Sequence, residues 1–103
     1  MYSLILAVAS NKKEARIIAK ELINHKLAAC VNIIGGVESL FWWKGKVDSA
    51  KETLLIIKSV KEKVPKVIKA IKSIHSYEVP EIITLPITAG YKPYLRWINE
   101  SLR

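Results

Sequence analysis

The sequence has a single cysteine, Cys30, which excludes an intrachain disulfide framework and fits a reducing cytosol. Its apolar runs are short, and the longest, such as Leu54 to Ile57, cannot cross a bilayer. The N-terminus has neither the basic region nor the small-residue cleavage site of a secretory signal. We therefore expect a cytoplasmic protein that does not enter membranes.

Glycine and proline are also scarce, with four of each, and they form no linker or low-complexity segment. What is present is a chain of 103 residues, half of them hydrophobic and a quarter charged. Such a composition is typical of a globular protein, and the length suits one hydrophobic core. We therefore predict a single domain over residues 1–103.

Acidic residues are few, nine against 17 basic ones, so the formal net charge is +8. Fourteen of the basic residues are lysines and three are arginines. Proteins that recognise a base sequence favour arginine for its planar, bidentate guanidinium group, so specific nucleic-acid recognition is not expected. The lysines are interpreted as solvated helix faces, and nonspecific binding of polyanions is the alternative.

The first third of the chain predicts a strand followed by a helix. Ser3 to Ala9 is a short apolar run, typical of a buried strand. Asn11 suits a helix N-cap and Glu14, three positions later, suits a capping box. The helix should end near Asn24 to Lys26. Its apolar residues recur at helical spacing and form one stripe: Ala15, Ile18, Ala19 and Leu22.

A long hairpin is predicted next. Leu27 to Phe41 is β-like, with Gly35-Gly36 marking a bulge or bend. Trp43 to Lys46 supplies the turn, where Gly45 can take a positive φ. Lys46 to Lys58 returns as a strand with apolar residues on both faces, which predicts that both faces are covered.

The last third predicts a helix, a strand and a short terminal helix. Ser59 with Glu62 forms a possible capping box for the second helix, and the stretch from His75 to Pro80 is read as a loop. Glu81 to Ile87 is predicted to be the last main strand, and Pro86 indicates that it borders an edge or a bulge. Pro93 starts the final helix, whose inward face is predicted to hold Tyr94, Leu95, Trp97, Ile98 and Leu102.

The order of elements predicts an α+β fold, a ferredoxin-like βαββαβ sandwich with a short C-terminal helix. In this fold both main helices cover one face of the sheet. The apolar residues on the opposite face then need a partner, and association of chains is the simplest way to bury them.

Trp42 and Trp43 are adjacent strand residues, so their indoles point to opposite faces. We expect one indole to enter the core of its own chain and the other to be covered by a second subunit. A stacking platform for nucleic-acid bases is the alternative.

Five segments together resemble the divalent-cation tolerance family called CutA, and the resemblance runs from about residue 3 to the C-terminus. They follow one another in the family's order and spacing: Lys26-Leu27-Ala28-Ala29-Cys30-Val31-Asn32, Phe41-Trp42-Trp43-Lys44-Gly45-Lys46, Lys58, His75-Ser76-Tyr77-Glu78-Val79-Pro80-Glu81 and Tyr94-Leu95-Arg96-Trp97. The resemblance implies a compact, heat-stable, cytosolic homotrimer joined through the long hairpins. The subunit interface would then include Phe41, Trp42, Trp43 and Lys44.

The function implied by the resemblance is noncatalytic tolerance of divalent cations, with copper binding and no obligatory cofactor. Ions or small ligands would bind in pockets between subunits, where the candidate residues are Lys58, His75, Tyr77 and Glu81. The alternative is a small-ligand sensor similar to the PII signalling proteins, in which Lys58 would meet an anion.

Metal ligation itself is supported by few residues. In some bacterial members copper is assigned to a first-strand cysteine and a His-His pair, but here these positions hold Ala7 and the pair Ile74-His75. His75 is thus the one metal candidate. A helix-end residue bonded to a carbonyl or stacked on Tyr77 is the alternative for His75. His25 is predicted to be a surface or helix-end residue, and Cys30 a small buried hydrophobic residue.

Overall fold

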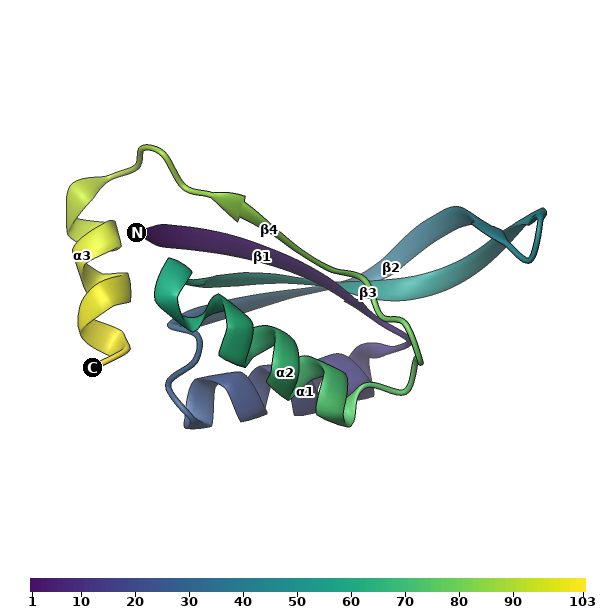
Figure 1. Ribbon diagram of the computed structural model, residues 1–103, viewed down its shortest axis with the longest axis horizontal. Coiled ribbons are helices and arrows are strands. Elements are labelled where there is room, and N and C mark those ends of the chain that lie inside the picture. The colour runs from purple at the N-terminus through teal and green to yellow at the C-terminus, as the bar shows by residue number, and fades with distance from the viewer.

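A computed structural model describes residues 1–103 and has four antiparallel strands in the order β2-β3-β1-β4 (Figure 1). Two helices, α1 and α2, cover one face of this sheet, and α3 lies at its end (Figure 1). The predicted ferredoxin-like α+β fold is therefore confirmed. Its elements are β1 (Tyr2–Ala9), α1 (Lys12–Asn24), β2 (Cys30–Trp43), β3 (Lys46–Val60), the 3-10 turn η1 (Lys61–Lys63), α2 (Val64–Ile74), β4 (Ile82–Pro86) and α3 (Lys92–Ser101).

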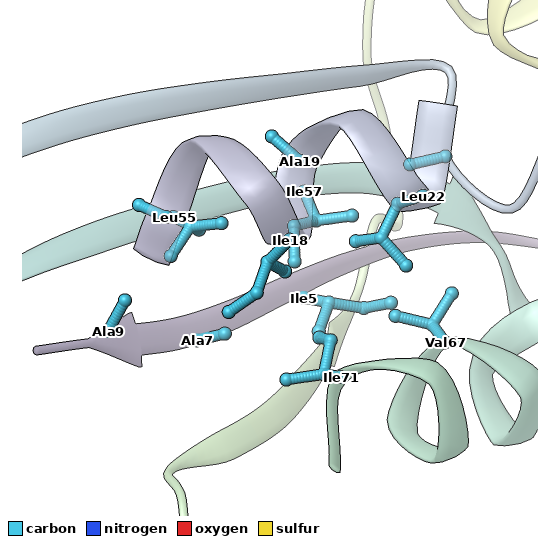
Figure 2. Close-up of a cluster of buried hydrophobic side chains, with 12 residues drawn as sticks. Ile5, Ala7, Ala9, Ile18, Ala19, Leu22, Leu55, Ile57, Val67 and Ile71 are labelled. Carbon is cyan, nitrogen blue, oxygen red and sulfur yellow. The ribbon is translucent and has the colours of Figure 1, made fainter. Parts of the chain in front are cut away.

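The core lies between the sheet and the two helices (Figure 2). Alternate residues of β1 and β3 point toward the helices, and Ile5, Leu55 and Ile57 among them are fully buried. The predicted α1 stripe meets them, as does a shorter stripe from α2 with Val67 and Ile71 (Figure 2). Burying large aliphatic side chains here provides the main driving force for folding.

Helix α1 begins where the sequence predicted, through a slightly different set of bonds. The Asn11 Oδ1 accepts a hydrogen bond from the Glu14 amide at 2.8 Å. The Glu14 carboxylate reaches back one residue further than in a capping box, to the amide of Ser10 at 2.8 Å.

The capping box predicted at Ser59 is wrong. Ser59 is a buried residue of β3, and its hydroxyl donates to the Leu27 carbonyl at 2.7 Å. Helix α2 begins later, at Val64, where Lys63 is the N-cap and gives no side-chain cap bond. The strand therefore holds the serine, and Pro65 in the first turn of the helix marks the start instead.

The β2-β3 hairpin extends well beyond the body of the molecule (Figure 1). The whole chain, with the hairpin, measures 44 × 26 × 23 Å. Its register shifts between Ile34 and Val37, which confirms the bulge predicted at Gly35-Gly36. At the tip, Lys44 and Gly45 have φ values of 50° and 77°, the left-handed pair that a two-residue hairpin turn requires.

Neither indole at the tip enters the core of its own chain, so that part of the prediction is wrong. Trp42 is 75% exposed and Trp43 57% exposed. The reason is reach, because α1 and α2 end short of this part of the hairpin (Figure 1).

The face of the sheet opposite the helices is apolar and open. Register places these side chains on it: Leu4, Leu6, Ile34, Leu54, Ile56, Ile83 and Leu85. Helix α3 buries Ile98 and Leu102, but Tyr94 and Trp97 remain exposed, contrary to the predicted inward face. Burial and the neighbouring Cys30 thiol raise the pKa of the Tyr94 hydroxyl. No helix is long and apolar enough to span a membrane.

Two neighbouring isoleucines on α1 test this description of the core. Ile18 is fully buried and Ile17 is 53% exposed. We expect Ile18→Ala to lower the free energy of unfolding by about 2–5 kcal/mol, because it leaves a cavity. Ile17→Ala should change it by about 0.5 kcal/mol or less. Urea unfolding of both variants measures this, and equal losses would contradict the placement of the core.

Candidate ligand groove beside the hairpin

A groove of about 690 Å³ lies where the hairpin leaves the body of the molecule. One wall is the open face of the hairpin, with Phe41 and Trp43 from β2 and Asp48 and Glu52 from β3. The other wall is the segment 76–81 between α2 and β4, and Val8 of β1 lies between the walls. The lining residues are Val8, Phe41, Trp43, Asp48, Glu52, Ser76, Tyr77, Glu78, Val79 and Glu81.

The charge of the groove is opposite to that of the whole chain. Four of the nine acidic residues line it, Asp48, Glu52, Glu78 and Glu81, and no basic residue does. Carboxylates gathered in a concave site concentrate a negative potential, which attracts cations. Aromatic rings in the same walls also favour cations through their faces.

Tyr77 joins the two walls of the groove. Its hydroxyl donates to the Glu52 Oε2 at 2.8 Å. Burial raises the pKa of Tyr77 to about 12, and the hydrogen bond and charge of Glu52 act in the same direction. The phenol therefore stays protonated at neutral pH and keeps donating to Glu52.

His75 lies behind this wall at the end of α2, with a side chain that is 0% exposed. Its Nε2 lies 2.7 Å from the Val8 carbonyl oxygen, and its Nδ1 accepts from the Tyr77 amide at 3.0 Å. Because a carbonyl only accepts, Nε2 carries the proton and both ring nitrogens are engaged. The rings of His75 and Tyr77 are 4.9 Å apart. These contacts agree with the helix-end interpretation of His75.

Glu14 attaches the same segment to the start of α1. Its carboxylate accepts from the Ser10 amide and hydroxyl at 2.8 and 2.9 Å, and from the Ser76 amide at 2.7 Å. Burial alone would raise the pKa of Glu14, but the hydrogen bonds from Ser10 and Ser76 outweigh it and lower the pKa to about 2.

Lys58 lies away from the other predicted site residues within one chain. Its Nζ is 3.6 Å from the Cys30 Sγ and donates to the Asn32 Oδ1. Along β3 it is six residues from Glu52, which corresponds to about 20 Å. Cys30 is correspondingly half-buried rather than a fully buried hydrophobe. His25 caps α1 and is exposed, as predicted.

The structure thus brings Tyr77 and Glu81 into one groove with His75 behind it, and leaves Lys58 at the far end of the open face. Sequence reasoning missed Asp48 and Glu52. Strand alternation could have found them, because both lie at even positions of β3 and face the same side as Trp43. No three His, Cys, Asp or Glu side chains of the chain are grouped closely enough to hold a metal ion.

Comparisons with a protein-family model and with single known proteins point to the same family. A family described as "CutA1 divalent ion tolerance protein" matches residues 3–101. The divalent-cation tolerance protein CutA of Thermus thermophilus is 41% identical over 98% of both chains. The chloroplastic protein CutA 1 of rice is 42% identical over 96% of this chain, which spans 56% of the rice protein.

Solved structures agree with the sequence relatives. The divalent cation tolerance protein of Thermus thermophilus superposes with a TM-score of 0.96 at 40% identity over 98% of each chain. A structure from Archaeoglobus fulgidus, described as a periplasmic divalent cation tolerance protein CutA, has a TM-score of 0.97 at 43% identity over 100% of each chain.

The pKa of Glu14 predicts acid sensitivity. A lowered pKa in the folded state stabilises the fold above the unfolded value of 4.5, and this stability is lost as the pH falls toward 2. We expect Glu14 to contribute roughly 3 kcal/mol to the loss of unfolding free energy between pH 5 and pH 2. Glu14→Gln should reduce that loss, whereas Glu21→Gln should preserve it. Equal pH dependence in both variants, measured by urea unfolding, would contradict the role of Glu14.

Proposed function

This chain belongs to the CutA1 divalent ion tolerance family, and we propose that it acts as a noncatalytic homotrimer that binds divalent cations, copper among them. Ions or small ligands are proposed to bind in pockets between subunits. The observation that carries the proposal is the acidic groove, because it concentrates four carboxylates on a chain of net charge +8.

The exposed hairpin and open sheet face support the homotrimer. The hairpin exposes Leu40, Trp42, Trp43 and Val47 beyond the body of the chain. The open face adds a second apolar surface, continuous with the hairpin through β3. Apolar area of this extent is typical of a surface covered by a partner. We assign Phe41, Trp42, Trp43 and Lys44 to the interface between copies.

The groove supports cation binding at its own residues. Glu52 and Glu81 provide oxygen donors, and Tyr77 holds Glu52 in place. His75 could add a nitrogen ligand, and ligation through its Nδ1 would require release of the Tyr77 amide. A single chain offers no complete set of metal ligands, so the proposal requires a neighbouring copy to complete the site. Lys58 can contribute only from such a copy.

The same contacts support binding without catalysis. Both His75 nitrogens are engaged with backbone groups, so the imidazole has no free nitrogen to act as a base. Cys30, the one thiol, contacts Lys58 and does not line the groove. We further propose a cytoplasmic, heat-stable protein, in agreement with an unpaired thiol and a composition rich in lysine and isoleucine.

The homotrimer predicts a mass of three times the 11.6 kDa chain by light scattering. We expect Trp42→Glu to dissociate it, because the change places a charge on an apolar contact. Ile17→Glu is the matched control on an exposed site of α1 and should leave the mass unchanged. A monomeric wild-type protein at micromolar concentration would overturn the proposed assembly.

Cation binding is tested by calorimetric titration with copper(II) and zinc(II). We expect the double variant E52Q/E81Q to bind at least about tenfold more weakly, since it loses two carboxylates from the groove. The control, E21Q/E100Q, makes the same charge change outside the groove. Equal affinity in both variants would contradict the groove as the site.

A small-ligand sensor is the second candidate function, and Lys58 favours it because no carboxylate lies within ion-pairing distance of its ammonium group. Titration with nucleotides and organic acids would then give binding that Lys58→Gln abolishes and E52Q/E81Q preserves. The two candidates therefore differ in which variant loses its ligand.

A further inference from the structure

The outer surface of the helices carries a second charged feature, opposite in sign to the groove. Seven exposed basic residues lie on the two adjacent helices α1 and α2, and the side chain of one of them, Lys12, lies against Gly35 of β2. We call the other six the basic layer: Lys13, Arg16, Lys20, Lys66, Lys69 and Lys72. They lie outside the buried stripes that pack on the sheet.

No charge of the basic layer is neutralised within the chain. The N-terminus pairs with Glu62, and the only other carboxylates within ion-pairing distance of a basic group are Glu21, beside the His25 ring, and Glu14, beside the His75 ring. None of these contacts includes a lysine or an arginine. Helix α2 contains no acidic residue, and the two on α1 are already engaged, Glu14 with Ser10 and Ser76 and Glu21 with His25. Repulsion among the six cations therefore favours an anionic partner.

The basic layer is also free when the proposed assembly forms. The helices α1 and α2 cover one face of the sheet, and the open face is the other (Figure 1). A partner seated on the open face therefore lies on the other side of the sheet from the outer surface of α1 and α2.

We infer that the basic layer binds the phosphate backbone of nucleic acid without reading its sequence. Helix α1 has 13 residues and is therefore about 20 Å long. A duplex carries roughly 12 phosphate charges over that length, counting both strands. Five of the six cations are lysines, which contact phosphates as point charges, and the single arginine gives little capacity for bidentate recognition of bases.

The composition of the layer favours nucleic acid over an anionic membrane. The large apolar residues exposed among the cations are isoleucines such as Ile17 and Ile68, and α1 and α2 carry no aromatic residue. Helices that lie in a membrane interface typically insert Trp, Phe or Leu. The exposed indoles of this chain are on the hairpin and on α3, away from the basic layer.

The test is fluorescence anisotropy with a labelled 20-base-pair DNA duplex over a range of salt concentrations. The layer variant K13Q/R16Q/K69Q/K72Q removes four cations from the basic layer. The control variant K46Q/K51Q/K92Q/R96Q removes three lysines and one arginine from exposed positions on the hairpin and α3. Both variants have the same net charge, and light scattering checks that their assembly is unchanged.

We expect the layer variant to bind at least tenfold more weakly than the control variant at low salt. Its slope of log affinity against log salt should also be shallower than that of the wild type by about 3 to 4, because four phosphate contacts are lost. Equal losses in both variants would show that net charge alone drives binding and would overturn the inference. Absence of binding by the wild type at low salt would also overturn it, as would preference for phosphatidylserine vesicles over the duplex. None of these outcomes depends on the cation groove.

Discussion

Strand β3 has two faces, and only one of them is covered by its own chain. Alternation along its 15 residues sends Leu55 and Ile57 toward the helices and Leu54 and Ile56 to the opposite side. The helices α1 and α2 both lie on one face of the sheet, so neither covers the second apolar set (Figure 1). The strand also continues beyond the helices, and there both faces lose their cover. The open face, the exposed indoles and the groove all follow from this unequal cover.

The groove persists because its outer wall is held at three places by buried or half-buried polar groups. Glu14 holds Ser76, His75 connects the Val8 carbonyl to the Tyr77 amide, and Tyr77 reaches Glu52 on the hairpin. A hydrogen bond to a charged group contributes about 1.5–3 kcal/mol, more than a neutral one. Two of the three attachments involve a carboxylate, which keeps a segment without regular structure in a defined position against the hairpin.

Local sequence signals predicted an element correctly where the residue concerned suits only one structural role. Asn11 predicted the start of α1 because its side chain can accept from an amide, and Gly45 predicted the turn because it tolerates a positive φ. The capping box predicted at Ser59 was wrong because the serine hydroxyl can equally donate to a backbone carbonyl, here that of Leu27. That choice depends on tertiary structure, which no local pattern contains.

The site was less predictable than the fold because its residues meet through the register of distant segments. The pair Tyr77–Glu52 joins positions 25 apart, and Lys58 lies far from both although it was grouped with Tyr77. The expectation that one indole is buried failed for a similar reason, since alternation gives the face of a side chain but not the reach of the helices beneath it.

The net charge of +8 describes the chain poorly because the two signs are segregated. Four carboxylates gather in the groove at the hairpin end of the open face, whereas six cations gather on the outer surface of α1 and α2. The distance between the two groups keeps them from neutralising one another, since screening at physiological salt limits the interaction between exposed charges to a range of about 8 Å. A cation and a polyanion can therefore approach the same chain from opposite sides without competing, and each surface responds to its local charge rather than to the total.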